Sequence, residues 1–373
     1  MRVRSVAGSG DLRAFIDLPY RLQGRDPLWV PPLRVAERAR LSRERNPFFR
    51  EAEAEYFVAW DGSRVVGRIA AIANRRHDEV YRDGCAFFGF FECEDDRETA
   101  RALLDAAGAW ARERGYRGIR GPASFSTNHE CGLLVEGFHT PPTVMMSHNP
   151  PYYAELLRAA GFEKAKDLIA FEGGSPGPFE IPERSRRAVE RLAARSGVRL
   201  RAFDSRDFKG EVERIKRGYN EAWERNWGFV PMSDLEIEHM ASEFRPVYIP
   251  DLVPLAFAGE RLVGFGLALP DINEILRTNR SGRLLPVLPR LLWAVRRRRL
   301  RRMRVLMLGL LPEVRGRGVD AMLWHWIWTR GLDHGFTWGE ASWILEDNAP
   351  MVNAALRMGF RRYKTYRLLE RAA

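Results

Sequence analysis

The stretch from Leu306 to Leu323 constrains the fold of this chain more than any other. Leu306–Leu311 is a continuous apolar run with the length of a buried strand. Apolar residues then recur at helical spacing from Val319 to Ile327. Between the two patterns lies Arg315–Gly318, which holds two arginines and two glycines. We therefore predict a strand, a Gly/Arg-rich turn and a helix, in that order.

This turn has the chemistry of an anion site. Gly316 and Gly318 let the backbone approach a ligand closely, because no Cβ is in the way. Unpaired N–H groups and the helix dipole favour an anion at a helix N-terminus, and Arg315 and Arg317 add donors that fit phosphate oxygens. The fingerprints of P-loop and dinucleotide-binding proteins do not fit the turn. We interpret it as a pyrophosphate cradle, with an ordinary Gly/Arg turn as the alternative.

Arg315–Gly318 resembles the acyl-CoA loop of the GNAT acetyltransferase superfamily, whose pattern is Arg/Gln-x-x-Gly-x-Gly/Ala; Asp320 replaces its last, small residue. The resemblance implies an acetyl-CoA or other acyl-CoA donor, an amine acceptor and no metal. It also implies backbone contacts to the donor from Leu310 and Leu311, and diphosphate contacts from the turn. Asn348 matches an Asn that the family places on the CoA side of its last helix.

Catalysis by such a protein needs a base that takes the ammonium proton. Glu340 and Glu346 follow the ligand helix and are the candidates. The family often has a Tyr, a general acid, four residues before the Gly that ends the last helix, but this chain has Ala355 there. Tyr363 is the substitute that lies near in sequence. Gly309 is expected to mark a bulge where the ligand strand splays from its neighbour.

The two halves of the chain look like copies. Asp61–Ala70 matches Ala258–Leu267, and the Gly-Phe pair at Gly161 matches that at Gly359 at almost the same offset. We predict an α/β (α+β) fold of two tandem GNAT-like domains, each a twisted, mixed, mostly antiparallel sheet flanked by helices. Their predicted extents are residues 1–173 and 183–373, with a Gly/Pro-rich linker at 174–182.

The first copy lacks the ligand loop. Its strand at Ala86–Glu92 runs into a segment with five carboxylates, which would repel a diphosphate, so we expect a degenerate domain that does not bind CoA there. Asn149 is predicted to cap the helix that ends at Gly161. The long polar loop at 121–149 is a packed loop, a contribution to the acceptor site or the domain interface, or a catalytic site of its own with a Ser–His pair. Its polar candidates are Ser126, Thr127, Asn128, His129, His139 and His148.

Two other groups are candidates for binding the acceptor. Trp223 and Trp227 fit an apolar acceptor pocket, and they equally fit helix packing. Asp271 and Asn273 end a predicted strand, where they fit either a polar acceptor or a turn with a helix cap.

The net charge of +11 favours anionic partners. Arg280–Arg304 combines leucines, a Trp and an arginine cluster, which fits a packed helix or contact with an anionic membrane. No nucleic-acid-binding module is recognisable, so no specific nucleic acid is expected. Three sparse cysteines and the absence of an apolar signal segment or a membrane span predict a cytoplasmic protein. The sequence leaves a monomer and a homodimer equally open.

The function predicted from these patterns is transfer of an acetyl or other acyl group from acyl-CoA to an amine, by an N-acetyltransferase-like enzyme. Two alternatives stay open. Asp320 and Ala355 favour a degenerate protein that binds CoA or lipid without turnover. Arg280–Arg304 favours a transferase that uses a long acyl donor at a membrane surface.

Overall fold

The computed structural model describes every residue except 175, 176, 178, 179 and 225. The chain divides into two compact units. Unit 1 comprises Met1–Leu168, Ile275–Pro289 and Lys364–Ala373, and unit 2 comprises Ile169–Glu274 and Arg290–Tyr363. The predicted linker at 174–182 lies partly outside the described residues, and the predicted domain boundaries at 173 and 183 stay predictions.

The sheet of unit 1 is mostly antiparallel. Its strands follow the order β1-β2-β3-β4-β5-β13, and β6 pairs with β13. Only β4 and β5 are parallel neighbours among the pairings within this unit that the structure describes. The strand bounds are β1 (Arg2–Ser5), β2 (Ala52–Asp61), β3 (Arg64–Asn74), β4 (Cys85–Cys93), β5 (Gly118–Gly121), β6 (Leu133–Glu136) and β13 (Arg361–Ala372), of which Lys364 onward belongs to this unit.

Helices cover both faces of this sheet. Leu103 and Leu104 of α4 join Ala59 in one core cluster, whereas the ring of Phe15 in α1 packs against Tyr56, 5.3 Å between centroids. Tyr56 and Ala59, three positions apart on β2, thus face different helices, as the period of two requires. The helices in Met1–Leu168, the first segment of unit 1, are α1 (Ser9–Leu22), α2 (Arg34–Arg40), α3 (Arg75–Tyr81), α4 (Arg97–Glu113) and α5 (Tyr153–Ala159), with a 3-10 turn at Pro47–Arg50.

The sheet of unit 2 is also mostly antiparallel. Its strands follow the order β12-β11-β10-β9-β8, antiparallel except for the parallel pair β11 and β12. The bounds are β8 (Val198–Ala202), β9 (Pro254–Ala258), β10 (Arg261–Pro270), β11 (Arg302–Leu310) and β12 (Trp338–Leu345). β7 (Glu163–Gly173) enters this unit at Ile169. The prediction of mixed, mostly antiparallel sheets flanked by helices is confirmed.

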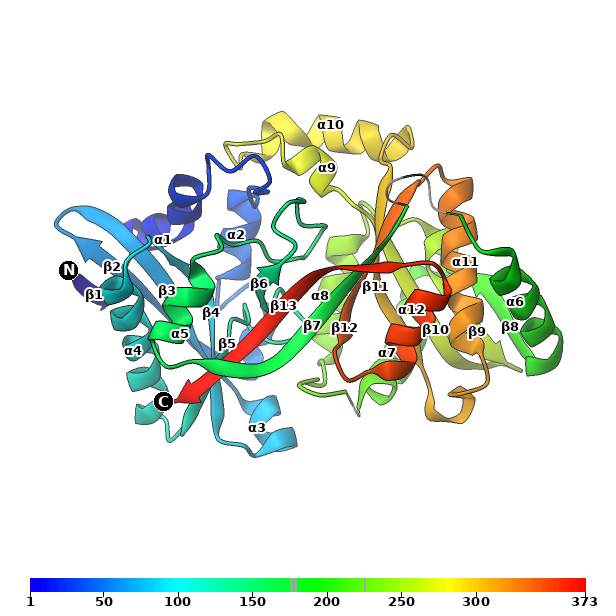
Figure 1. Cartoon of the computed structure of the whole chain (residues 1–373), viewed down its shortest axis with the longest axis horizontal. Coiled ribbons are helices and arrows are strands. Elements are labelled where there is room, and N and C mark those ends of the chain that lie inside the picture. The colour runs from blue at the N-terminus through cyan, green and yellow to red at the C-terminus, as the bar shows by residue number, and fades with distance from the viewer. Residues whose placement is uncertain (175–176, 178–179, 225) are drawn as a thin grey trace. The chain divides into compact units, whose positions relative to one another are not determined.

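Two helix pairs cover the faces of the second sheet (Figure 1). On one face, α6 (Glu183–Ser196) lies beside α11 (Val319–Asp333), whose Val319 and Leu323 pack on the strands. On the other, α7 (Phe208–Trp223) and α8 (Asp234–Phe244) pack with Phe265 of β10. The remaining helices are α9 (Asn273–Leu276), α10 (Leu284–Arg296) and α12 (Ala349–Arg357), with 3-10 turns at Ser205–Asp207, Pro250–Leu252 and Pro312–Val314.

The predicted cap at Asn149 is wrong. α5 begins at Tyr153, and no side chain caps it. The Asn149 carboxamide instead accepts a hydrogen bond from the backbone N–H of Leu134, 2.7 Å away, and donates to the carbonyl oxygen of the same residue. The Asn-Pro signal therefore anchors the long loop to β6. In the part of the chain that the structure describes, no helix has the length and apolar character needed to cross a membrane.

Candidate acyl-donor groove

A groove opens where the pairing of β11 with β12 stops. The two parallel strands pair from Arg302 opposite Trp338 to Val305 opposite Ala341, although both strands continue further. The groove beyond that point has a cavity volume of about 90 Å³. Its walls come from both strands, α11, α12 and the end of α7: Trp223, Asn226, Val305, Leu306, Met307, Leu308, Trp324, Ala341, Ser342, Trp343, Ile344, Asn348 and Met351.

A bulge in β11 lies at the start of this groove. Met307 pairs with Leu267 of β10 and Val305 with Ala268, so Leu306 is the extra residue. The prediction that Gly309 marks the bulge is therefore wrong. Gly309 instead makes room for Trp223, because a Cβ there would lie 2.5 Å from the indole ring.

Arg315–Gly318, here named the anion loop, forms the start of α11. Gly316 and Gly318 have φ values of +73° and +81°, a region that glycine adopts without strain. Gly318 precedes the first helical residue, and no side chain caps the helix. The first N–H groups of α11 are thus left without a capping side chain, as an anion site requires. Asp320 lies half-buried in the first turn, where a carboxylate stabilises the helix dipole.

The two arginines of the anion loop are exposed but held at one end. Arg315 donates to the carbonyl oxygens of Ala222, at 3.0 Å, and Leu310, at 3.2 Å. Arg317 donates to the carbonyl oxygen of Ser196, at 3.3 Å. These bonds fix the guanidinium groups beside the N-terminus of α11, where their charge adds to that of the helix dipole.

Among the residues predicted to contact the donor, Leu310 ends β11 and Leu311 follows it. Leu310 is half-buried and pairs with Gly264 of β10. Leu311 donates its N–H to Val263 and accepts from the N–H of Val314, so both of its backbone groups are bonded within the protein. Asn348 lines the groove and caps α12, accepting from the N–H of Met351 at 3.3 Å.

A buried polar cluster lies behind the groove. Arg304 and Glu340 are 1% and 0% exposed, and their side chains are 3.6 Å apart. Ser342 Oγ accepts from Arg304 at 3.0 Å and donates to Glu340, and Tyr363 donates its hydroxyl proton to the same carboxylate. The structure therefore brings together two predicted catalytic residues, Glu340 and Tyr363. Ser342 links them to the groove, and the sequence analysis did not assign it a role.

The other predicted residues lie apart from this cluster. Glu346 is exposed at the end of the β12 segment. Trp223 lines the groove, whereas Trp227 is half-buried in the loop after α7. Asp271 is 2% exposed, lies 3.3 Å from Arg302, and accepts from the backbone N–H of Asn273 at the start of α9. These contacts support the turn interpretation of Asp271 and Asn273.

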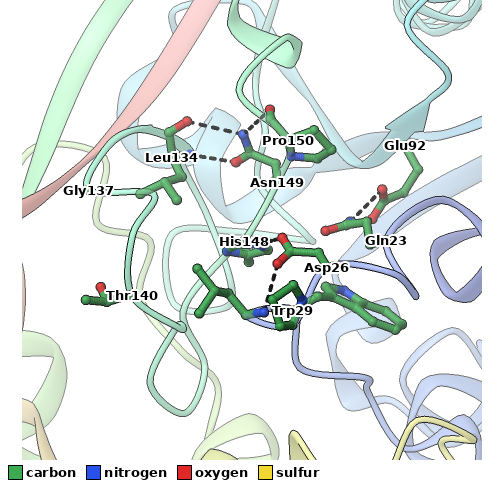
Figure 2. Close-up of polar contacts among 12 residues, drawn as sticks. Gln23, Asp26, Trp29, Glu92, Leu134, Gly137, Thr140, His148, Asn149 and Pro150 are labelled. Atoms are coloured by element: carbon green, nitrogen blue, oxygen red, sulfur yellow. Dashed lines mark hydrogen bonds and ion pairs between the residues drawn. The ribbon is translucent and has the colours of Figure 1, made fainter.

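Unit 1 has a carboxylate where unit 2 has its loop. Glu92, the penultimate residue of β4, is buried and accepts a hydrogen bond from Gln23, at 2.8 Å (Figure 2). It also accepts one from the hydroxyl of Tyr153, at 2.8 Å. Burial raises the pKa of Glu92, although Arg68 lies 3.7 Å away and opposes the shift. Asp96 then caps α4 by accepting from the N–H of Thr99. The N-terminus of α4 is therefore capped by a carboxylate of the protein itself.

The long polar loop of unit 1 is held by internal contacts. His148 Nε2 lies 2.7 Å from Asp26 (Figure 2), and burial lowers the pKa of this imidazole. Ser126 Oγ lies 3.0 Å from Nδ1 of His129, whose ring packs on Phe125. These contacts support the interpretation of a packed loop.

Comparison with known proteins gives close relatives in sequence. The chain is 35% identical over 380 residues to the bacterial ceramide synthase of Caulobacter vibrioides, covering 100% of this chain and 97% of that protein. It is 32% identical over 377 residues to protein YghO of Escherichia coli K12, covering 99% and 95%. No family model matches the sequence.

Solved structures resemble the whole chain in fold. A tandem GNAT protein from the clavulanic acid biosynthesis pathway superimposes with a TM-score of 0.59 at 15% identity, covering 100% of this chain and 98% of that one. A GCN5-related N-acetyltransferase from Sphaerobacter thermophilus gives 0.54 at 15% identity, covering 100% and 95%. The chain thus has the tandem GNAT fold, and it belongs to the family of the bacterial ceramide synthase of Caulobacter vibrioides and YghO of Escherichia coli.

Proposed function

We propose that this protein transfers an acyl group from acyl-CoA to an amine. The observation that carries the proposal is one arrangement in unit 2. A groove lies between two separating parallel strands, and β11, which lines it, leads through a short turn to a helix N-terminus that has two arginines and no capping side chain. Such a site fits a ligand with an extended chain at one end, which lies in the groove, and a diphosphate at the other end, which binds at the helix N-terminus.

In this proposal, pantetheine lies along β11 as an added strand would. The backbone of Leu306–Leu310 contacts it, and the backbone of Leu311 contributes less because its groups are bonded to Val263 and Val314. The anion loop binds the diphosphate, and Asn348 faces the donor from α12. Acetyl-CoA is the smallest donor that fits this scheme.

Ser342 and Glu340 supply the base in the proposed reaction. The attacking ammonium gives a proton to Ser342 Oγ, while the hydroxyl proton of Ser342 passes to Glu340 along an existing hydrogen bond. The amine nitrogen then forms a bond to the thioester carbon, and backbone N–H groups of β11 stabilise the oxyanion. The C–S bond breaks, and CoA leaves as a thiolate that takes up the second proton lost by the attacking nitrogen, which leaves the neutral amide. Tyr363 positions Glu340 through its hydroxyl.

The acceptor that we propose is a long-chain amine. A ceramide is the N-acyl derivative of a long-chain amino alcohol, so the name of the Caulobacter relative supports this class of acceptor. The deciding experiment is to measure release of CoA from acetyl-CoA and longer acyl-CoA donors with long-chain amino alcohols. Steady release would exclude a binding protein without turnover, and no release with any pair would refute the transferase.

Arg315→Glu is expected to weaken acyl-CoA binding about 30-fold, roughly 2 kcal/mol, because it removes a charge-assisted bond and places a carboxylate beside the diphosphate. Calorimetric titration measures the affinity. Arg330→Glu is the matched control: it makes the same charge change at the opposite end of α11, where Arg330 is exposed beside Asp333. Equal affinities of the two variants for acyl-CoA would contradict the proposal that the anion loop binds the diphosphate.

We further propose that α10 contacts an anionic membrane. Arg280–Arg304 contains ten arginines and no acidic residue, so this segment carries nearly all of the net charge of +11. Leu285 and Trp293, two turns apart on α10, are 83% and 56% exposed, and Arg299 lies over the indole ring. Exposed apolar side chains framed by arginines are typical of a helix that lies in the interface of an anionic bilayer.

Leu285→Ser combined with Trp293→Ser is expected to raise the lipid concentration for half-maximal binding at least tenfold, because two apolar side chains no longer enter the bilayer. Co-sedimentation with vesicles of phosphatidylglycerol and phosphatidylcholine measures this. Leu235→Ser combined with Leu332→Ser, which removes two exposed leucines elsewhere, is the control. The proposal fails when wild-type protein does not bind these vesicles, or when both pairs of substitutions have the same effect.

A further inference from the structure

Trp343 carries a hydrogen-bond donor that the proposed reaction does not use. Its indole nitrogen is buried and has no hydrogen-bond partner in the part of the chain that the structure describes. An indole N–H can only donate, and a buried donor that stays unpaired destabilises the folded protein. Because nearly all buried polar groups in proteins are paired, an unpaired one at a cleft indicates a role toward a ligand.

Trp343 lies where the two strands of the groove separate. The last parallel pair joins Val305 of β11 to Ala341 of β12, and Trp343 is the second residue of β12 beyond that pair. Like Ser342, it lines the groove. The unpaired N–H therefore belongs to a residue of the groove wall, at the end where the strands part.

Arg304 holds the indole beside the proposed base. Its guanidinium lies over the Trp343 ring, 5.1 Å from the centroid, and its Nε donates to Ser342 Oγ at 3.0 Å. Arg304 is itself buried and is paired with Glu340. One buried side chain thus positions both the indole of Trp343 and the hydroxyl of Ser342.

A carbonyl oxygen is the partner that such a donor needs. The part of acyl-CoA that lies in the groove in our proposal has carbonyl oxygens on its thioester and on the amides of pantetheine. Ser342 takes the ammonium proton in the proposed reaction, so the amine and the thioester carbon meet beside it. Trp343 directly follows Ser342, which favours the thioester oxygen, since the amide oxygens lie further toward the diphosphate.

We infer that the indole N–H of Trp343 donates a hydrogen bond to the thioester oxygen of the acyl donor and stabilises the oxyanion that forms there. The inference rests on the proposed function. When the amine nitrogen bonds to the thioester carbon, the π electron pair of the C=O bond moves onto the oxygen. The pair returns as the C–S bond breaks, and the indole keeps its proton throughout. A donor that is in place before the charge develops needs no reorganisation in the transition state.

Trp343→Phe tests this role because it removes the N–H and keeps an aromatic ring. The variant is expected to lose about 100-fold in kcat, the usual effect of removing one oxyanion donor, with a smaller change in KM. Thermal stability should fall far less than kcat, because the lost N–H has no partner in the folded protein. Should Trp343→Phe not fold, 3-benzothienylalanine at this position replaces it, since this analogue has sulfur in place of the N–H and the shape of tryptophan.

Trp326→Phe is the matched control. Trp326 lies on α11, outside the residues that line the groove, and its N–H donates to the carbonyl oxygen of Asp251 at 2.9 Å. The same change of side chain there removes a hydrogen bond within the protein. It should therefore lower thermal stability and leave kcat near the wild-type value.

The indole N–H signals in the NMR spectrum of the full chain test the contact without turnover. The chain has 11 tryptophans, so these signals are few, and the one that Trp343→Phe lacks belongs to Trp343. Acetyl-CoA should move this proton signal downfield, as a new hydrogen bond does. S-ethyl-CoA, a thioether of the same length without the carbonyl oxygen, should not.

The outcomes separate the role of Trp343 from the transferase. CoA release by the wild type with an unchanged kcat in folded Trp343→Phe, or an equal shift with both CoA derivatives, would overturn the role of Trp343 and leave the transferase intact. Equal losses of kcat in Trp343→Phe and Trp326→Phe would overturn it as well. No release with any acceptor, together with a shift that only acetyl-CoA produces, would refute the transferase and support the contact with the carbonyl oxygen.

Discussion

Replacing Arg304 by methionine is expected to lower the free energy of unfolding of unit 2 by about 3–5 kcal/mol. Arg304 and Glu340 are buried together between β11 and β12, and the methionine would leave the carboxylate of Glu340 without its cation. Removing one partner of a buried pair is more destabilising than removing both. Urea titration followed by circular dichroism measures the change.

Arg330→Met is the control for this prediction, since Arg330 forms an exposed pair with Asp333 and should contribute less than about 1 kcal/mol. The double variant Arg304→Met with Glu340→Leu should be more stable than the sum of its two single changes, because no unpaired charge remains. A loss below 1 kcal/mol in Arg304→Met would show that the pair does not hold the strands together.

Ser342→Ala is expected to lower kcat about 100-fold with little change in the affinity for acyl-CoA. The alanine interrupts the route by which the ammonium proton reaches Glu340, and loss of a positioned base costs roughly two to four powers of ten in rate. Ser342→Thr keeps a hydroxyl and should recover most of the activity. Steady-state kinetics and calorimetric titration separate kcat from affinity.

Two results would contradict this role of Ser342. A Ser342→Ala protein with wild-type kcat would exclude the relay. Equal losses of kcat, affinity and thermal stability would indicate that Ser342 is only a structural partner of Arg304, with which it is hydrogen-bonded. Glu346→Gln tests whether Glu346, the second predicted base, takes the proton in place of Glu340. A large loss of kcat in this variant would identify Glu346 as the base.

The anion loop could be predicted from sequence because its signal is local. Strand, glycines, arginines and helix follow one another within Leu306–Leu323, and propensity and spacing act over that range. The hairpins β2–β3 and β9–β10 could be predicted for the same reason, from alternation around Gly62 and Gly259. These turns have positive φ at both glycines.

The features that the sequence analysis did not predict depend on contacts between residues far apart in the chain. Nothing local marks Arg304 as the partner of Glu340, because the pair depends on the parallel register of β11 with β12. The bulge fell at Leu306 and not at Gly309, because the glycine is needed to admit the Trp223 ring. Asn149 lost its capping role to β6, which the sequence analysis did not predict.

The final strand has a consequence for how the chain is made. Residues Lys364–Ala373 belong to unit 1, where β13 pairs with β5 through Leu369 and with β6 through Tyr366. Lys364 is fully buried and donates to the carbonyl oxygens of Gly137 and Thr140. Unit 1 therefore lacks this strand until residues 364–373, which follow unit 2 in the chain, have been synthesised. Its early strands must wait with an open edge while unit 2 is synthesised, which is the situation in which chaperones protect a nascent chain.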